Sequence, residues 1–69
     1  MSVKLKGEFT EPEVEYFRQK CNFTEDERDV FELRVRGKSI VAISLALHMS
    51  ESTVSRRLRG IKNKIVRVL

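Results

Sequence analysis

The chain of 69 residues is poor in the residue types that build catalytic, metal or disulfide centres, with one cysteine, one histidine and no tryptophan. A single cysteine excludes an intramolecular disulfide and favours a reducing, cytoplasmic compartment. One histidine and one cysteine supply neither a metal-binding cluster nor a nucleophile with its base, and no glycine-rich phosphate loop is present. We therefore expect no metal, no cofactor and no enzymatic activity.

Long apolar runs are missing as well, because the longest purely apolar run covers only residues 40–43. A membrane-spanning helix needs roughly 20 such residues, and the first residues of the chain lack the apolar segment of a signal peptide. Residues 54–69 have the charge of a cationic helix that lies on a membrane surface, but they contain no aromatic residue. Their apolar stripe continues a predicted core, so we expect no membrane association.

Acidic residues are scarce in the second half of the chain, where residues 37–69 carry seven bases against one acid, a net charge of +6. Residues 1–22 carry four bases and four acids, and residues 23–36 carry three bases against five acids. The positive charge is therefore local. A local basic patch is typical of proteins that bind a polyanion, and the alternative is an ordinary solvated surface.

Caps and apolar spacing predict four helices joined by short connections. Glu27 follows Thr24 by three residues and completes a capping box, and Gly37 is a natural C-cap because glycine enters the left-handed region without a steric cost. The helices are expected over residues 10–22 (N-cap Thr10 or Glu11), 24–37 (N-cap Thr24), 40–47 (N-cap Ser39) and from 51 onwards (N-cap Ser50).

The last predicted helix combines a core stripe with a polar face that is rich in arginine. Its apolar residues recur every three or four positions, which predicts a buried stripe of Val54, Leu58, Ile61 and Ile65. Arginine, hydroxyl and amide side chains near a helix N-terminus are the groups that read the major groove of duplex DNA. The opposite face carries Ser52, Arg56, Arg59 and Asn63, with Ser55 and Thr53 on its flanks.

Residues 2–9 have a weaker pattern, in which Val3, Leu5 and Phe9 stand at alternating positions. This spacing fits a strand or an extended arm. Because no other strand is predicted for it to pair with, we expect an extended arm over residues 1–9. The structured alternative is pairing with a second copy of the chain.

A short capped helix, a tight turn and a second capped helix with exposed bases form a helix-turn-helix. Between Phe23 and Ile65, the segments F-T-E-D-E-R-D-V-F-E-L-R-V-R-G-K-S and I-S-L-A-L-H-M-S-E-S-T-V-S-R-R-L resemble the DNA-binding domain of LuxR-type (LuxR/GerE) regulators. They are also similar to the fourth conserved region of bacterial sigma factors. The combination of T-E-x-E-R, G-K-S and S-E-S-T-V at these separations is much more specific than any one of them.

The resemblance implies that residues 39–47 support the helix from Glu51, which would enter the major groove. The base-contacting positions of the family correspond here to Ser55, Arg56 and Arg59, and the helical spacing adds Ser52. Phosphate contacts set the register on DNA without reading its sequence. The resemblance implies phosphate contacts by Lys38, Thr53, Arg57 and Lys62, and we also assign Ser39 and Asn63 to this group.

Two departures from the family lie in the helix-turn-helix itself. The turn usually holds glycine where this chain has His48, which would cost roughly 1 kcal/mol if the backbone there is left-handed. Val41 and Leu45 are apolar where relatives are usually polar. We expect the first helix to cover them through Val14 and Phe17, and the alternative is that they form a protein interface.

A third departure is the absence of the helix that LuxR-type domains add after the recognition helix, which commonly makes their dimer contact. The sequence after residue 65 reads only V-R-V-L. This favours the sigma-like form of the fold, in which the recognition helix is close to terminal, with a further helix placed at the N-terminus instead.

These observations predict one all-α domain over residues 1–69, a small three- to four-helix bundle that contains a helix-turn-helix. It would comprise an arm (1–9), an added helix (10–22) and a LuxR- or sigma-like core (23–69). The expected function is sequence-specific binding of double-stranded DNA by a small cytoplasmic regulator of bacterial or phage origin. The alternative is a sigma-like accessory or interaction module that contacts RNA polymerase. A small domain covers few base pairs, so we expect a homodimer or a polymerase partner.

Overall fold

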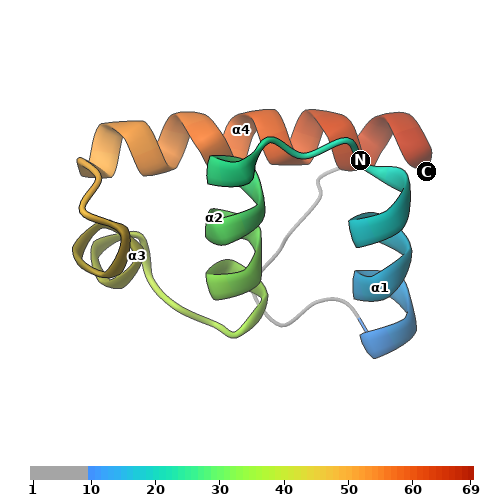
Figure 1. The fold of residues 1–69 in the computed structure, drawn as a ribbon, viewed down its shortest axis with the longest axis horizontal. Helices are drawn as coiled ribbons and strands as arrows, with labels where there is room; N and C mark the ends of the chain where they lie inside the picture. Colours follow the sequence, from blue (N-terminus) through green and yellow to red (C-terminus); the bar gives the residue numbers. More distant parts are fainter. Residues whose placement is uncertain (1–9) are drawn as a thin grey trace.

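A computed structural model describes residues 10–69, which fold into four α-helices (Figure 1). The expected arm over residues 1–9 lies outside the described residues. The prediction of an all-α domain with four helices is confirmed. In chain order the helices are α1 (Glu11–Lys20), α2 (Glu25–Val35), α3 (Ile40–Leu47) and α4 (Glu51–Val68).

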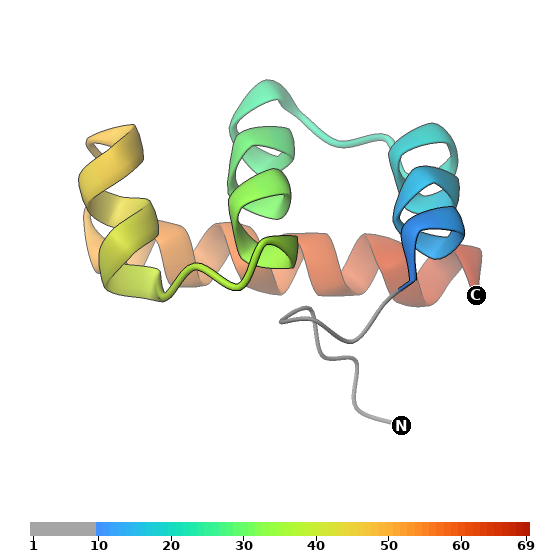
Figure 2. The same cartoon turned by 90° about the horizontal axis from the view of Figure 1, so that it is seen from below.

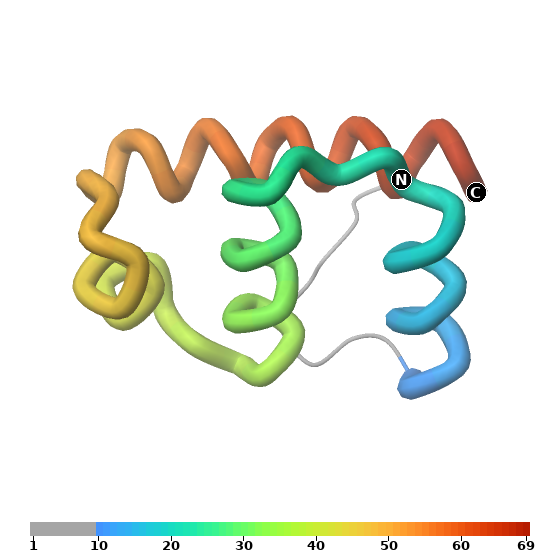
Figure 3. Tube along the Cα trace, viewed as in Figure 1, coloured from blue at the N-terminus to red at the C-terminus, as the bar shows by residue number. Residues whose placement is uncertain are grey.

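Helix α4 is the longest element, and the other three helices cross one side of it. From the N-terminal to the C-terminal end of α4, the crossing order is α3, α2 and α1 (Figures 1 and 2). With 18 residues, α4 is about 27 Å long at the usual rise per residue. The backbone trace shows how tightly α3 turns into α4, through residues 48–50 alone (Figure 3). The three helices therefore cover one side of α4 along its length.

The core lies between α4 and the three crossing helices. The predicted apolar stripe of α4 is confirmed, because all four of its residues are buried. Fully burying a valine, leucine, isoleucine or phenylalanine side chain contributes about 1.5–3 kcal/mol, so this shared core is the main source of stability. Its members are Val14, Phe17 and Cys21 near α1, Val30 and Phe31 on α2, Ile43 on α3, and Val54, Leu58, Ile61 and Ile65 on α4.

Each helix begins at one of the predicted N-caps. The side chains of Thr10, Thr24, Ser39 and Ser50 each accept a hydrogen bond from the backbone N–H three residues later. Of the two candidates for α1, Thr10 is the cap. Helix α1 ends at Lys20, two residues before the predicted end, because Cys21 has an extended backbone that leads the chain away towards α2.

Two left-handed residues end α2 and α3. Gly37 has a φ of 88°, and the N–H of Lys38 reaches back to the carbonyl of Leu33 at 3.2 Å. His48 has a φ of 56°, so the backbone is left-handed at the position where the resembled family usually has glycine. The N–H of Met49 donates to the carbonyl of Ser44 at 3.0 Å, so the turn that joins α3 to α4 satisfies its own backbone.

The expectation that the first helix covers Val41 and Leu45 is wrong. Helix α1 packs against the C-terminal end of α4, at the opposite end of the molecule from α3 (Figures 1 and 2). The Tyr16 hydroxyl donates to the carbonyl of Val68 at 3.3 Å, which is consistent with this position. Val41 is consequently 51% exposed and Leu45 73% exposed.

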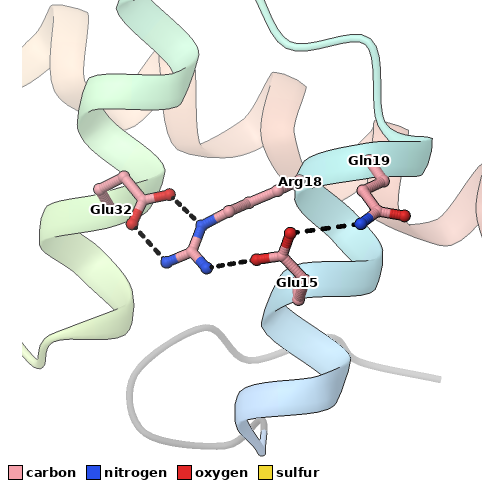
Figure 4. Close-up of polar contacts among 4 residues, drawn as sticks. All are labelled: Glu15, Arg18, Gln19 and Glu32. Atoms are coloured by element: carbon pink, nitrogen blue, oxygen red, sulfur yellow. Dashed lines mark hydrogen bonds and ion pairs between the residues drawn. The ribbon is translucent and has the colours of Figure 1, made fainter.

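An ion-pair network joins α1 to α2 (Figure 4). The Arg18 guanidinium donates to both carboxylate oxygens of Glu32, at 2.6 and 2.7 Å, and a third nitrogen donates to Glu15 at 3.0 Å. Gln19 also donates to Glu15, at 3.3 Å. The hydrogen bonds from Arg18 lower the pKa of the Glu32 carboxyl, so the bridge holds α1 beside α2 near neutral pH.

Candidate nucleic-acid interface

The first turn of α4 is organised by hydroxyl groups. Ser50 accepts the N–H of Thr53 at 3.1 Å and donates its own hydroxyl to the Thr53 oxygen at 2.9 Å. The same Thr53 oxygen accepts a hydrogen bond from the Arg56 guanidinium at 3.3 Å. The cap of the helix therefore also positions Arg56. The Thr53 side chain is half-buried and already engaged in these bonds.

The six exposed residues of α4 between Ser52 and Asn63 form a surface that is called the outer face below. All four residues predicted to contact bases lie on it and are exposed. Within residues 10–69, no hydrogen bond or ion pair engages the side chains of Arg59 or Lys62. The only acid on α4 is Glu51, so the outer face has an uncompensated positive charge. The outer face consists of Ser52, Ser55, Arg56, Arg59, Lys62 and Asn63.

Two residues predicted to contact phosphate come from the start of α3 instead. The Ser39 hydroxyl accepts the N–H of Ala42 at 3.1 Å and so caps α3. Lys38 has an exposed side chain, and its carbonyl accepts a hydrogen bond from Arg34 at 2.9 Å. The base-contacting and phosphate-contacting predictions thus fall on two helices that are joined by one tight turn.

Arg57 is directed away from the outer face. One of its guanidinium nitrogens lies 3.6 Å from the Asp26 carboxylate on α2, and its Nε atom is buried without a hydrogen-bond partner among the described residues. A phosphate contact by Arg57 would have to share this guanidinium with Asp26. The structure therefore separates Arg57 from Arg56 and Arg59, its neighbours along the chain.

A partly buried ion pair between α4 and α2 was not predicted from the sequence. Lys64 donates to the Glu27 carboxylate at 2.5 Å and to the carbonyl of Asn22 at 2.7 Å. Glu27 is 8% exposed and also accepts the N–H of Thr24 at 2.9 Å. A side chain at Gly60 would bring its Cβ within 2.8 Å of the other Glu27 oxygen. One carboxylate thus caps α2 and fixes how α4 lies against it.

Charge pairing decides the ionisation of Glu27. Burial alone would raise the pKa of its carboxyl, but the Lys64 ammonium and the Thr24 N–H together lower that pKa below its ordinary value. The carboxylate is therefore charged near neutral pH. The sequence offered one signal for this pair, since Glu27 is the capping-box residue of α2, but its partner is 37 positions away.

A cleft of about 470 Å³ between α1 and α2 is lined by Arg18, Cys21 and Arg28, among others. Burial raises the pKa of the Cys21 thiol, which makes it a poor nucleophile. Residues 10–69 contain no group of three histidine, cysteine, aspartate or glutamate side chains placed to hold a metal ion. None of the four helices is long and apolar enough to cross a membrane.

Comparisons with models of protein families, with curated proteins and with solved structures found no match to this chain.

Proposed function

We propose that this domain binds duplex DNA with sequence preference, through the outer face of α4 in the major groove. The observation that carries the proposal is the outer face itself, where Arg56 and Arg59 are exposed close to a capped helix N-terminus and face no acidic partner among residues 10–69. Arginine can pair bidentately with guanine, and exposed serine hydroxyls can reach base edges or phosphates. This supports a helix-turn-helix of the LuxR or sigma region 4 kind.

The proposed roles follow the surroundings of each side chain. Arg56 and Arg59 would read bases, assisted by Ser52 and Ser55. Thr53 holds Arg56 through its hydroxyl and would orient it in the groove. Phosphate contacts would come from the start of α3, through Lys38 and Ser39, and from α4, through Lys62 and Asn63. Arg57 would have to break its 3.6 Å contact with Asp26 before it could reach a phosphate.

Binding to duplex DNA at varied salt concentration tests this function. If four to six phosphates are neutralised, the logarithm of the binding constant should fall with the logarithm of salt concentration with a slope of about −4 to −5. A slope near zero, or no binding at low salt, would reject the proposal. A preferred sequence, obtained by selection from random duplexes, should bind more tightly than its scrambled version at every salt concentration.

A second candidate function is docking on RNA polymerase as a sigma-like accessory, and the exposure of Val41 and Leu45 favours it. The two functions predict different results without DNA. An accessory should bind purified polymerase in the absence of a duplex, and Leu45→Gln should weaken that binding. A DNA-binding regulator should need no polymerase to recognise its site.

A further inference from the structure

Helix α3 presents an exposed apolar face that has no neighbour among the described helices. Val41 and Leu45 are four residues apart, so they lie on the same side of α3, and they are 51% and 73% exposed. Ile43 on the opposite side is fully buried. None of the eight residues of α3 is charged. The exposed side of α3 that carries Val41 and Leu45 is called the α3 face below.

The α3 face belongs to the helix that stands beside the N-terminal end of α4, where the proposed DNA-binding residues lie. Helix α3 stands at one end of the molecule, beside the N-terminal end of α4, and α2 and α4 lie on its inner side (Figures 1 and 2). A two-fold contact through α3 would therefore bring the N-terminal ends of two α4 helices towards one symmetry axis. Those ends carry Arg56 and Arg59.

Size and charge together narrow what the α3 face can bind. Stable interfaces use roughly 20–30 residues from each partner, far more than two exposed side chains provide, so a free dimer is not expected. The net charge of +4 also makes two free copies repel each other. An uncharged face, however, can meet an identical face without like charges coming together.

Binding to duplex DNA would remove both obstacles to this contact, the charge repulsion and the small contact area. Phosphates neutralise the basic residues, and two copies on adjacent sites are held at a high effective concentration, so a small apolar contact becomes sufficient. Resting on the proposed DNA binding, we propose that the α3 face is the contact between two copies bound to neighbouring, inverted sites on one duplex. The contact makes their binding cooperative.

Duplexes with one selected site, or with two inverted copies at increasing spacing, test this inference with the full chain. The second copy should bind about 10- to 100-fold more tightly than the first. The effect should be confined to one short spacing, because a further helical turn of DNA would move the two copies roughly 34–36 Å apart and break a direct contact between domains whose longest extent is 29 Å. Light scattering of the free protein should show a monomer.

Two leucines provide a matched pair of variants. Leu45→Gln should abolish the cooperativity and leave binding to a single site unchanged. Leu69→Gln removes a leucine that is equally exposed, at 72%, but lies at the far end of α4, and it should leave the cooperativity intact. Circular dichroism and thermal unfolding of both variants check that each remains folded.

The outcomes separate this inference from the proposed function. Independent binding of two copies at every spacing, with single-site binding intact, would overturn the inference alone. So would cooperativity that survives Leu45→Gln. If the α3 face instead docks on polymerase, two copies should bind DNA independently when polymerase is absent, which would also overturn the inference. Failure to bind any single site would overturn the proposed function, and the inference with it.

Discussion

The basic residues of α4 divide into two sets with different surroundings. Arg57 and Lys64 face α2, where each has an acidic partner. The other four bases, Arg56, Arg59, Lys62 and Arg67, are exposed and have no acidic partner among residues 10–69. All belong to one helix, so composition and net charge do not distinguish them. Their angular position around α4, and the acids on α2, decide which bases hold the fold together and which are free to bind a polyanion.

The largest expected effect is a loss of stability on removing Lys64, one of the two bases that face α2. Lys64→Met keeps the length of the side chain but leaves the buried Glu27 carboxylate without its ammonium partner, so the free energy of unfolding should fall by about 2–3 kcal/mol. Urea unfolding followed by circular dichroism measures it. Lys62→Met, two residues away on the outer face, is the matched control and should change stability by less than about 0.5 kcal/mol. Equal losses for both variants would contradict the division into two sets.

Removing Arg56 or Arg59 should reduce the sequence preference in DNA binding and leave folding unchanged. Arg56→Ala and Arg59→Ala should each reduce the preference for the selected site over a scrambled one by about 1–3 kcal/mol, because a base contact is lost. Competition binding with both duplexes measures this difference. Arg57→Ala serves as the control, since its guanidinium points towards Asp26, and should leave the preference unchanged. If Arg56→Ala and Arg59→Ala weaken both duplexes alike, the base-contact roles are wrong.

Low pH should weaken the ion pair between Lys64 and Glu27. The pKa of the Glu27 carboxyl is lowered in the folded protein, so between its folded and unfolded pKa values the unfolded chain binds more protons. The stabilisation is complete above the ordinary value of about 4.5 and is lost as pH falls through the folded pKa. One such group contributes at most about 1.4 kcal/mol per pH unit.

Unfolding curves recorded from pH 6 to pH 2 should show this loss in the wild-type protein. Glu27→Gln keeps a capping side chain but removes the titrating group, so its stability should be lower at pH 6 and decline less steeply towards acid. Lys64→Met should also decline less steeply, because it removes the ammonium that lowers the pKa. A slope that matches the wild type in both variants would show that this pair does not control the acid response.

The smallest expected effect concerns one phosphate contact. Lys62→Met should weaken binding to all duplexes by a similar factor and make the salt slope shallower by about 0.9, the value for one neutralised phosphate. Binding isotherms at four or more salt concentrations resolve this change. A change in sequence preference would instead place Lys62 among the base-contacting residues.

The helices and their caps could be predicted from the sequence because they depend on local signals. Thr24 and Glu27 form their capping box across three residues, and Gly37 and His48 end their helices within a single turn. The exposed outer face also followed from helical spacing, since Arg56 and Arg59 stand opposite the buried stripe. What these residues bind stays a prediction.

Contacts between distant helices could not be predicted in the same way. No local signal indicates that α1 packs at the C-terminal end of α4, so the expected cover for Val41 and Leu45 was assigned to the wrong end of the molecule. The pairing of Arg57 with Asp26 was missed for a related reason. Arg57 lies at the margin of the apolar stripe, where helical spacing alone does not distinguish an inward from an outward side chain.

Gly60 has a consequence for how α4 tolerates substitution. Alanine is ordinarily about 1 kcal/mol better than glycine in the interior of a helix. At this position, however, even a methyl group would meet the Glu27 carboxylate at 2.8 Å, and that carboxylate is held in place by Lys64 and Thr24. The helix thus retains its least favourable residue at mid-length. In a library of random variants, position 60 should be a narrow intolerant point within a helix whose outer positions accept many residues.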